Sequence, residues 1–99
     1  MINVVIQKSS NPKKKYDAVF NGTKTISFGA AGYQDFIISK GDESKRQSYI
    51  KRHGNEDWSR GNIESAAWLS RWILWEKPTI QQAITHANKM YQGVKFILK

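Results

Sequence analysis

The segment WLSRWILWEKP, residues 68–78, restricts the fold of this chain more than any other stretch. It holds three of the four tryptophans, which recur at i, i+4 and i+7 and therefore share one face of a helix. A protein surface rarely leaves an apolar stripe of this size in water, so we predict a helix of about 13 residues that lies in the core. The stripe consists of Trp68, Leu69, Trp72, Ile73 and Trp75.

Two other roles for tryptophan remain open at this point. Trp58 lies outside the stripe, in a polar loop beside Arg60, where an indole is suited to stacking on nucleic-acid bases. A helix lying on a membrane surface is the other alternative, but only Arg71 and Lys77 supply basic charge in this stretch. We expect Arg71 to pair with an acidic side chain or to stack on an indole rather than to contact DNA.

Length and composition indicate a single ordered domain over residues 1–99, because the chain is short, 39% hydrophobic and free of internal repeats. The absence of cysteine excludes disulfides and thiolate ligands and leaves His53 and His86 as the histidine ligands. We therefore expect no metal and no cofactor. No apolar run approaches the roughly 20 residues of a membrane span, and residues 1–6 are too short for a signal peptide, so we expect no membrane partner.

The first third of the chain is typical of strands. Residues 2–8, INVVIQK, are β-branched and predict a strand or an extended arm, which a linker follows. Asn21-Gly22 between two alternating segments predicts a β-hairpin, because both residues tolerate positive φ. The glycine-bracketed residues 29–32 then end the hairpin, and residues 33–38 form a short extended or turn-like apolar segment.

Helix signals dominate the rest of the chain. Asp42 is a good N-cap for a largely polar and basic helix over about 43–53, and Asn62 is a candidate cap for the tryptophan helix. Thr79 with Gln82 completes a capping box for a third helix. The segment VKFIL, residues 94–98, alternates as a final strand that pairs with the hairpin or with the opening strand.

Together these signals predict a small α+β domain. Its sheet is antiparallel, based on the hairpin, has three to four strands and packs on about three helices. Residues 1–12 form the strand or arm with its linker, and residues 13–99 form the compact core.

Charge is the strongest bulk signal for function. The chain has 16 Lys and Arg against 8 Asp and Glu, a formal net charge of +8, which attracts polyanions. Phosphate contact requires positive side chains on an ordered surface, so we predict nucleic-acid binding with little sequence selectivity, to DNA rather than RNA. The alternative is a basic surface that is simply solvated. The candidate binding residues are Lys13, Lys14, Lys15, Lys45, Arg46, Lys51, Arg52, His53, Trp58 and Arg60.

An enzymatic interpretation would have to rest on His53 with Glu56 or Asp57. No second histidine is close to it in sequence, and residues 29–32 lack the glycine-lysine pattern that cradles phosphate. We therefore expect a non-enzymatic protein without catalytic residues and without a small-molecule substrate.

Four blocks of the sequence stand out together: FGAAGYQDF (28–36), YIKRH (49–53), EDW (56–58) and SRWILWEKPT (70–79). In this order and spacing they resemble a family of small basic domains of uncharacterised function encoded by nucleocytoplasmic large DNA viruses. The resemblance spans residues 11–87, although Ala67, Trp68 and Leu69 depart from the family pattern, which has Gly and a Phe-Trp pair there. It implies a viral protein found in the virion, and in the host cytoplasm or nucleus during infection. It assigns no catalytic residue.

A structural role is the competing interpretation. A strand at each end of the chain can add to the sheet of a neighbouring subunit, as edge strands do in assemblies. The protein would then be a minor capsid or cement protein that docks between larger capsid subunits through these strands and an apolar patch. Its partners would be capsid or other virion proteins.

Overall fold

A four-stranded mixed sheet organises the protein in the computed structural model, which describes residues 2–99. The strand order is β3-β2-β1-β4, with β1 antiparallel to β2 and parallel to β4. The predicted α+β class is confirmed, but the sheet is mixed because the chain between β1 and β4 acts as a crossover connection. The strands are β1 (Ile2–Lys8), β2 (Lys14–Phe20), β3 (Lys24–Ala30) and β4 (Val94–Leu98).

The opening segment is a strand at the centre of the sheet. Val4 and Ile6 of β1 are fully buried, and β1 pairs with a strand on each side. The strand predicted within residues 1–12 is therefore confirmed, and the extended arm is not observed. Met1 lies outside the described residues. Because both edges of β1 are occupied, it has no free edge for a neighbouring subunit.

The predicted hairpin is confirmed between β2 and β3. Asn21 and Gly22 have φ values of 51° and 73°, the left-handed region that such a turn requires. The backbone N–H of Asn3 also donates to the Asn21 side-chain oxygen at 2.8 Å, so the turn is tied to β1.

Two of the three predicted helix starts are confirmed. Helix α1 (Glu43–Arg52) begins after Asp42, whose carboxylate accepts from the N–H of Ser44 at 3.0 Å. Helix α3 (Ile80–Met90) begins after Thr79, whose hydroxyl accepts from the N–H of Gln82. Burial of Ala83, Ile84 and Ala87 fixes the face that α3 turns toward the core.

The tryptophan segment is divided in two. A short α-helix, α2 (Ala66–Leu69), continues into a π-helical turn, η2 (Ser70–Leu74). Ser65, rather than the predicted Asn62, caps α2, since its hydroxyl accepts from the N–H of Trp68. Asn62 instead ends a 3₁₀ turn, η1 (Arg60–Asn62), and its amide donates to the carbonyl of Asp57.

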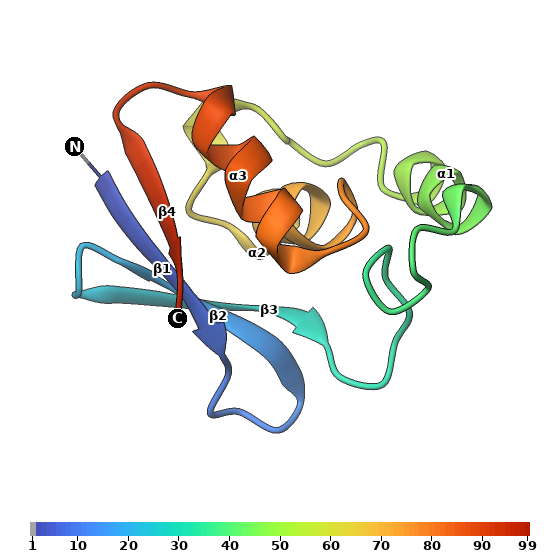
Figure 1. Ribbon diagram of the computed structural model, residues 1–99, viewed down its shortest axis with the longest axis horizontal. Coiled ribbons are helices and arrows are strands. Elements are labelled where there is room, and N and C mark those ends of the chain that lie inside the picture. Colours follow the sequence, from blue (N-terminus) through green and yellow to red (C-terminus); the bar gives the residue numbers. More distant parts are fainter. Residues whose placement is uncertain (1) are drawn as a thin grey trace.

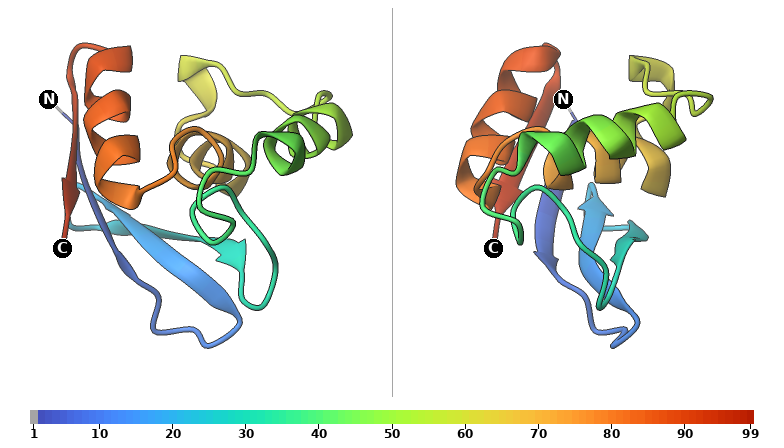
Figure 2. Two further views of the ribbon diagram at one scale, coloured as in Figure 1. Left: turned by 45° about the vertical axis from the view of Figure 1, so that its right-hand side comes forward. Right: turned by 90° about the vertical axis from the view of Figure 1, so that its right-hand side faces the viewer.

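All the helices lie on one face of the sheet (Figures 1 and 2). Helix α3 packs against β4, and α2 packs against β3, whereas α1 extends beyond the end of the sheet. The core lies between these layers. Trp68 is fully buried and stacks on Phe96 with ring centroids 5.7 Å apart, and Trp75 is also buried. The predicted core role of the tryptophan stripe is confirmed, with Trp72 half-buried at its margin.

Candidate nucleic-acid interface

A cleft of about 830 Å³ lies between α1 and the adjacent ends of β2 and β3. One face of α1 forms the first wall, because residues three or four positions apart project from the same side of a helix. The hairpin and the loop after β3 form the second wall, and α2 with η2 forms the floor. Residues that line it include Lys14, Lys15, Tyr33, Asp35, Lys45, Ser48, Tyr49, Arg52, His53, Glu56, Ala66, Leu74 and Trp75.

Arg46 fixes the position of α1 relative to the core. All three of its guanidinium nitrogens donate hydrogen bonds: to the carbonyl of Trp75 at 3.0 Å, to Glu76 at 2.7 Å and to Glu43 at 3.0 Å. Its side chain is 18% exposed. Sequence placed Arg46 among the phosphate-binding residues, but its charge is already neutralised, and the structure gives it a structural role.

Glu76 is the carboxylate on which this attachment depends. It accepts from Arg46 and from Arg71, whose nitrogen lies 2.8 Å away. Burial acts to raise the pKa of Glu76, but the hydrogen bonds from the two arginines outweigh it and hold the pKa below its usual range. Arg71 is buried against the indole rings of Trp58 and Trp72, as predicted for it.

Aromatic stacking completes the attachment of α1. The Tyr49 ring packs on Trp75 with centroids 4.5 Å apart and on His53 with centroids 4.3 Å apart. Burial, and secondarily the nearby Glu56, raises the pKa of the Tyr49 hydroxyl. His53 Nδ1 lies 3.1 Å from Glu56, so the histidine at the cleft has a carboxylate partner.

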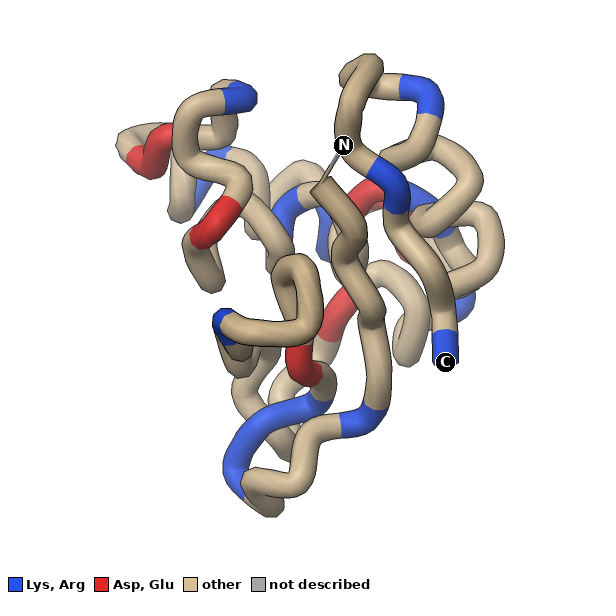
Figure 3. The backbone as a smooth tube through the Cα atoms, turned by 90° about the vertical axis from the view of Figure 1, so that its left-hand side faces the viewer, with Lys and Arg blue, Asp and Glu red and all other residues tan. Residues whose placement is uncertain are grey.

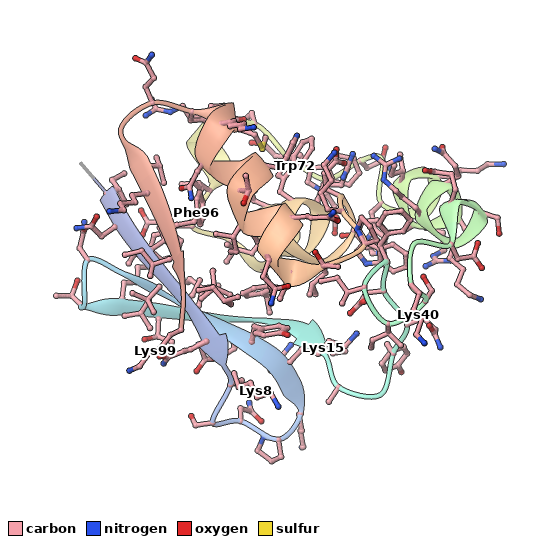
Figure 4. The ribbon with its side chains drawn as sticks, in the orientation of Figure 1. Lys8, Lys15, Lys40, Trp72, Phe96 and Lys99 are labelled. Atoms are coloured by element: carbon pink, nitrogen blue, oxygen red, sulfur yellow. The ribbon has the colours of Figure 1, made fainter. Side chains whose placement is uncertain are left out.

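Lys15 serves to hold the loop that follows β3. Its ammonium donates to Asp35 at 2.6 Å and to the carbonyl of Tyr33 at 2.5 Å. The side chain is 12% exposed and that of Asp35 is 3% exposed. Figure 4 shows Lys15 at the hairpin end nearest this loop. Lys15, one of the predicted nucleic-acid-binding residues, lines the cleft, but its charge is paired within the protein.

Lys14, Lys45 and Arg52 differ from Lys15 and Arg46. All three are exposed, and none forms an ion pair with another residue in the described range 2–99. They line the same cleft although Lys14 and Lys45 are 31 positions apart in the sequence. The structure therefore brings together free cations from two of the predicted basic clusters.

The remaining predicted site residues lie elsewhere. Lys13 and Lys51 are exposed but do not line the cleft, and Figure 3 shows the Lys13–Lys15 run at the end of the sheet near the β1–β2 loop. Arg60 lies near β4, where it donates to the carbonyl of Gln92 and covers the ring of Tyr91. Trp58 is half-buried against the core beneath Arg71, so it is not the exposed base-stacking platform that its sequence context suggests.

Tyr33 is the cleft residue that sequence reasoning missed. Its side chain is 72% exposed, the highest value among the exposed large hydrophobic residues of the described chain. The sequence predicts a short extended or turn-like apolar segment over residues 33–38, which fits the buried Phe36 but not the exposed Tyr33. Tyr33 directly follows Gly32, which has a φ of 86°, and this glycine is the local signal that sets Tyr33 apart.

Residues 2–99 include no group of three or more His, Cys, Asp or Glu side chains placed to hold a metal ion. No helix in that range is long and apolar enough to cross a membrane. The cleft itself presents positive charge, hydrogen-bonding groups and aromatic side chains.

Residues 4–53 match the model of a family described as "Family of unknown function (DUF5754)". The chain belongs to this family. The DUF5754 match includes β2, β3 and α1, and thus all three free cations of the cleft, whereas the floor formed by α2 and η2 follows it. No curated protein and no solved structure matches the chain.

Proposed function

We propose that the protein binds nucleic acid through phosphate contacts in the cleft between α1 and the β2–β3 hairpin. The observation that carries this proposal is the convergence on one cleft of Lys14, Lys45 and Arg52, none of which has an ion-pair partner within residues 2–99. Positive side chains that are exposed and unpaired are available to phosphate oxygens.

The charge balance of the cleft supports an anionic ligand. Among the described residues its lining contains Lys14, Lys15, Lys45 and Arg52 but only two carboxylates, Asp35 and Glu56. Asp35 is paired with Lys15, and Glu56 lies 3.1 Å from Nδ1 of His53. The three free cations therefore outnumber Glu56, the one lining carboxylate without a lysine or arginine partner, and the cleft attracts a phosphate.

The proposed binding has little sequence selectivity and involves no catalysis, cofactor or small-molecule substrate. Phosphate contacts position a protein on nucleic acid but carry no sequence information. DNA is the proposed ligand, and a virion and the infected cell are the proposed setting. These two points rest on the resemblance of the four sequence blocks to proteins of large DNA viruses.

The test is a titration of fluorescein-labelled DNA, single-stranded and duplex in separate experiments, followed by anisotropy near physiological salt. The triple variant Lys14→Ala, Lys45→Ala, Arg52→Ala is expected to bind roughly tenfold more weakly, or worse, than the unchanged protein. The matched control removes three exposed lysines in α3, in β4 and directly after β4: Lys89→Ala, Lys95→Ala and Lys99→Ala.

The control separates the cleft from overall charge, because both triple variants lose three positive charges. The proposal predicts that the α3–β4 variant keeps most of the affinity. Equal losses in the two variants, or no DNA binding by the unchanged protein, would overturn it.

A capsid role is the second candidate, and the edge position of β4 favours it. One side of β4 is unpaired within the described sheet, and Ile97 on this strand is 40% exposed. An open strand edge next to an apolar side chain is suited to pairing with another sheet. Ile97→Lys should abolish co-sedimentation with capsid subunits in this case and leave DNA affinity unchanged.

A further inference from the structure

Tyr33 exposes more of its side chain than any other large hydrophobic residue in the described chain, yet its backbone is held firmly. Its carbonyl accepts from the Lys15 ammonium, and its N–H donates to the carbonyl of Ala30 at 3.3 Å. The neighbouring Asp35 carboxylate is fixed by Lys15 and by the N–H of Ile38 at 2.7 Å. The loop thus presents an aromatic ring at a defined position on the cleft.

The ring and the free cations occur in the same site. Tyr33 lines the cleft together with Lys14, Lys45 and Arg52. Proteins that bind single strands combine cations that follow the backbone with aromatic side chains on which bases stack. The Tyr33 ring does not serve the packing of the protein, because it lies outside the hydrophobic core cluster. Its exposed surface is therefore available to a ligand.

We propose that Tyr33 stacks on an unpaired base, so that the cleft binds single-stranded nucleic acid in preference to duplex. The inference rests on the proposed function and adds its substrate class. In a duplex both faces of each base are covered by neighbouring bases, and an exposed tyrosine gains no stacking surface without unstacking them. In a single strand the base faces are accessible.

The dimensions of the cleft agree with this assignment. Its volume of about 830 Å³ falls within the range of about 300–1,000 Å³ that holds small organic ligands. Such a space suits individual nucleotides of a strand rather than a whole duplex. Ser48 and Gln34, which also line the cleft, offer hydrogen bonds without a charge preference.

The experiment compares labelled oligothymidine with a labelled duplex, using Tyr33→Ala, Tyr33→Phe and the unchanged protein. Loss of the ring is expected to weaken single-strand binding about tenfold, whereas phenylalanine, which keeps the stacking surface, should stay within about twofold. Duplex binding should not change in either variant. Ile38→Ala is the control, because Ile38 is a 52% exposed apolar residue of the same loop that does not line the cleft.

The outcomes separate this inference from the proposed function. If Tyr33→Ala binds single strands as well as the unchanged protein, or loses single-strand and duplex binding equally, the stacking role is refuted while phosphate binding by the cleft stands. A duplex preference of the unchanged protein would also refute it. If no DNA is bound at all, the proposed function itself fails. Thermal unfolding of each variant checks that Tyr33→Ala remains folded.

Discussion

The ammonium of Lys15 lies 2.6 Å from the carboxylate of Asp35, and this pair joins β2 to the loop that presents Tyr33. Lys14, the preceding residue, is exposed and unpaired within the described chain. Adjacent lysines therefore have different roles: Lys15 holds the cleft together, and Lys14 remains available to a ligand.

Replacement of Lys15 by methionine should destabilise the fold. The substitution keeps most of the side-chain volume but leaves the Asp35 carboxylate, which is nearly fully buried, without its cation. Removing one partner of a buried ion pair costs about 3 kcal/mol. Urea denaturation measures this loss. Lys13→Met, at an exposed position, is the control and should change the free energy of unfolding by less than about 0.5 kcal/mol. Equal effects at the two positions would contradict the structural role of Lys15.

Glu76→Gln should destabilise the protein at neutral pH and much less in acid. The folded-state pKa of Glu76 lies below its usual value, so its contribution to stability is present above the unfolded pKa and is lost as pH falls through the folded pKa. The neutral amide removes charge-assisted hydrogen bonds from Arg46 and Arg71, at a cost of about 2 kcal/mol. The measurement is urea unfolding at pH 7 and at a series of pH values below the usual glutamate pKa of about 4.3. The difference in free energy of unfolding between Glu76→Gln and the unchanged protein should become smaller as the pH falls.

Glu64→Gln provides the control for this pH series. Glu64 pairs with Lys24, but both side chains are about half exposed, so the pair contributes little. A Glu76 effect no larger than that of Glu64 would show that the Arg46–Glu76 attachment does not hold α1 in place.

Gly29→Ala should be more destabilising than Gly32→Ala. Both glycines have positive φ, 77° and 86°, where alanine costs about 1–2 kcal/mol. At Gly29 the added methyl would also lie 2.7 Å from the buried Leu74 side chain, a clash that costs about 1–3 kcal/mol more. Nothing lies within 4 Å of the corresponding position at Gly32. Thermal unfolding of the two variants isolates the contact, and equal melting temperatures would argue against the close packing of β3 on η2.

Local signals predicted most of the elements. Asp42 and Thr79 cap helices, and Asn21-Gly22 turns the hairpin, because each acts on backbone groups within a few residues of itself. The parallel pairing of β1 with β4 joins the two ends of the chain, and no local pattern encodes which partner a final strand will choose. The change from the α-helix α2 to the π-helical turn η2 could not be predicted either, because the spacing of the tryptophans in the sequence is that of a continuous helix.

The candidate site was predicted only in part, for the same reason. In the sequence Lys15 looks like Lys14, and Arg46 looks like Lys45. Their roles differ because folding brings Asp35 to Lys15 and brings Glu76 to Arg46 across 30 positions. Basic composition predicted a polyanion-binding surface, but only the tertiary arrangement distinguishes cations that are free from cations that are paired.

The dependence of affinity on salt tests the central claim most directly. For single strands the slope of log affinity against log salt is about −0.7 for each phosphate contacted, so three lost contacts should make the slope about 2 units shallower. We predict this change for the Lys14, Lys45 and Arg52 triple variant binding oligothymidine, and no comparable change for the Lys89, Lys95 and Lys99 variant. If the cleft variant keeps the slope of the unchanged protein, its three cations do not contact phosphates and the proposed interface is wrong.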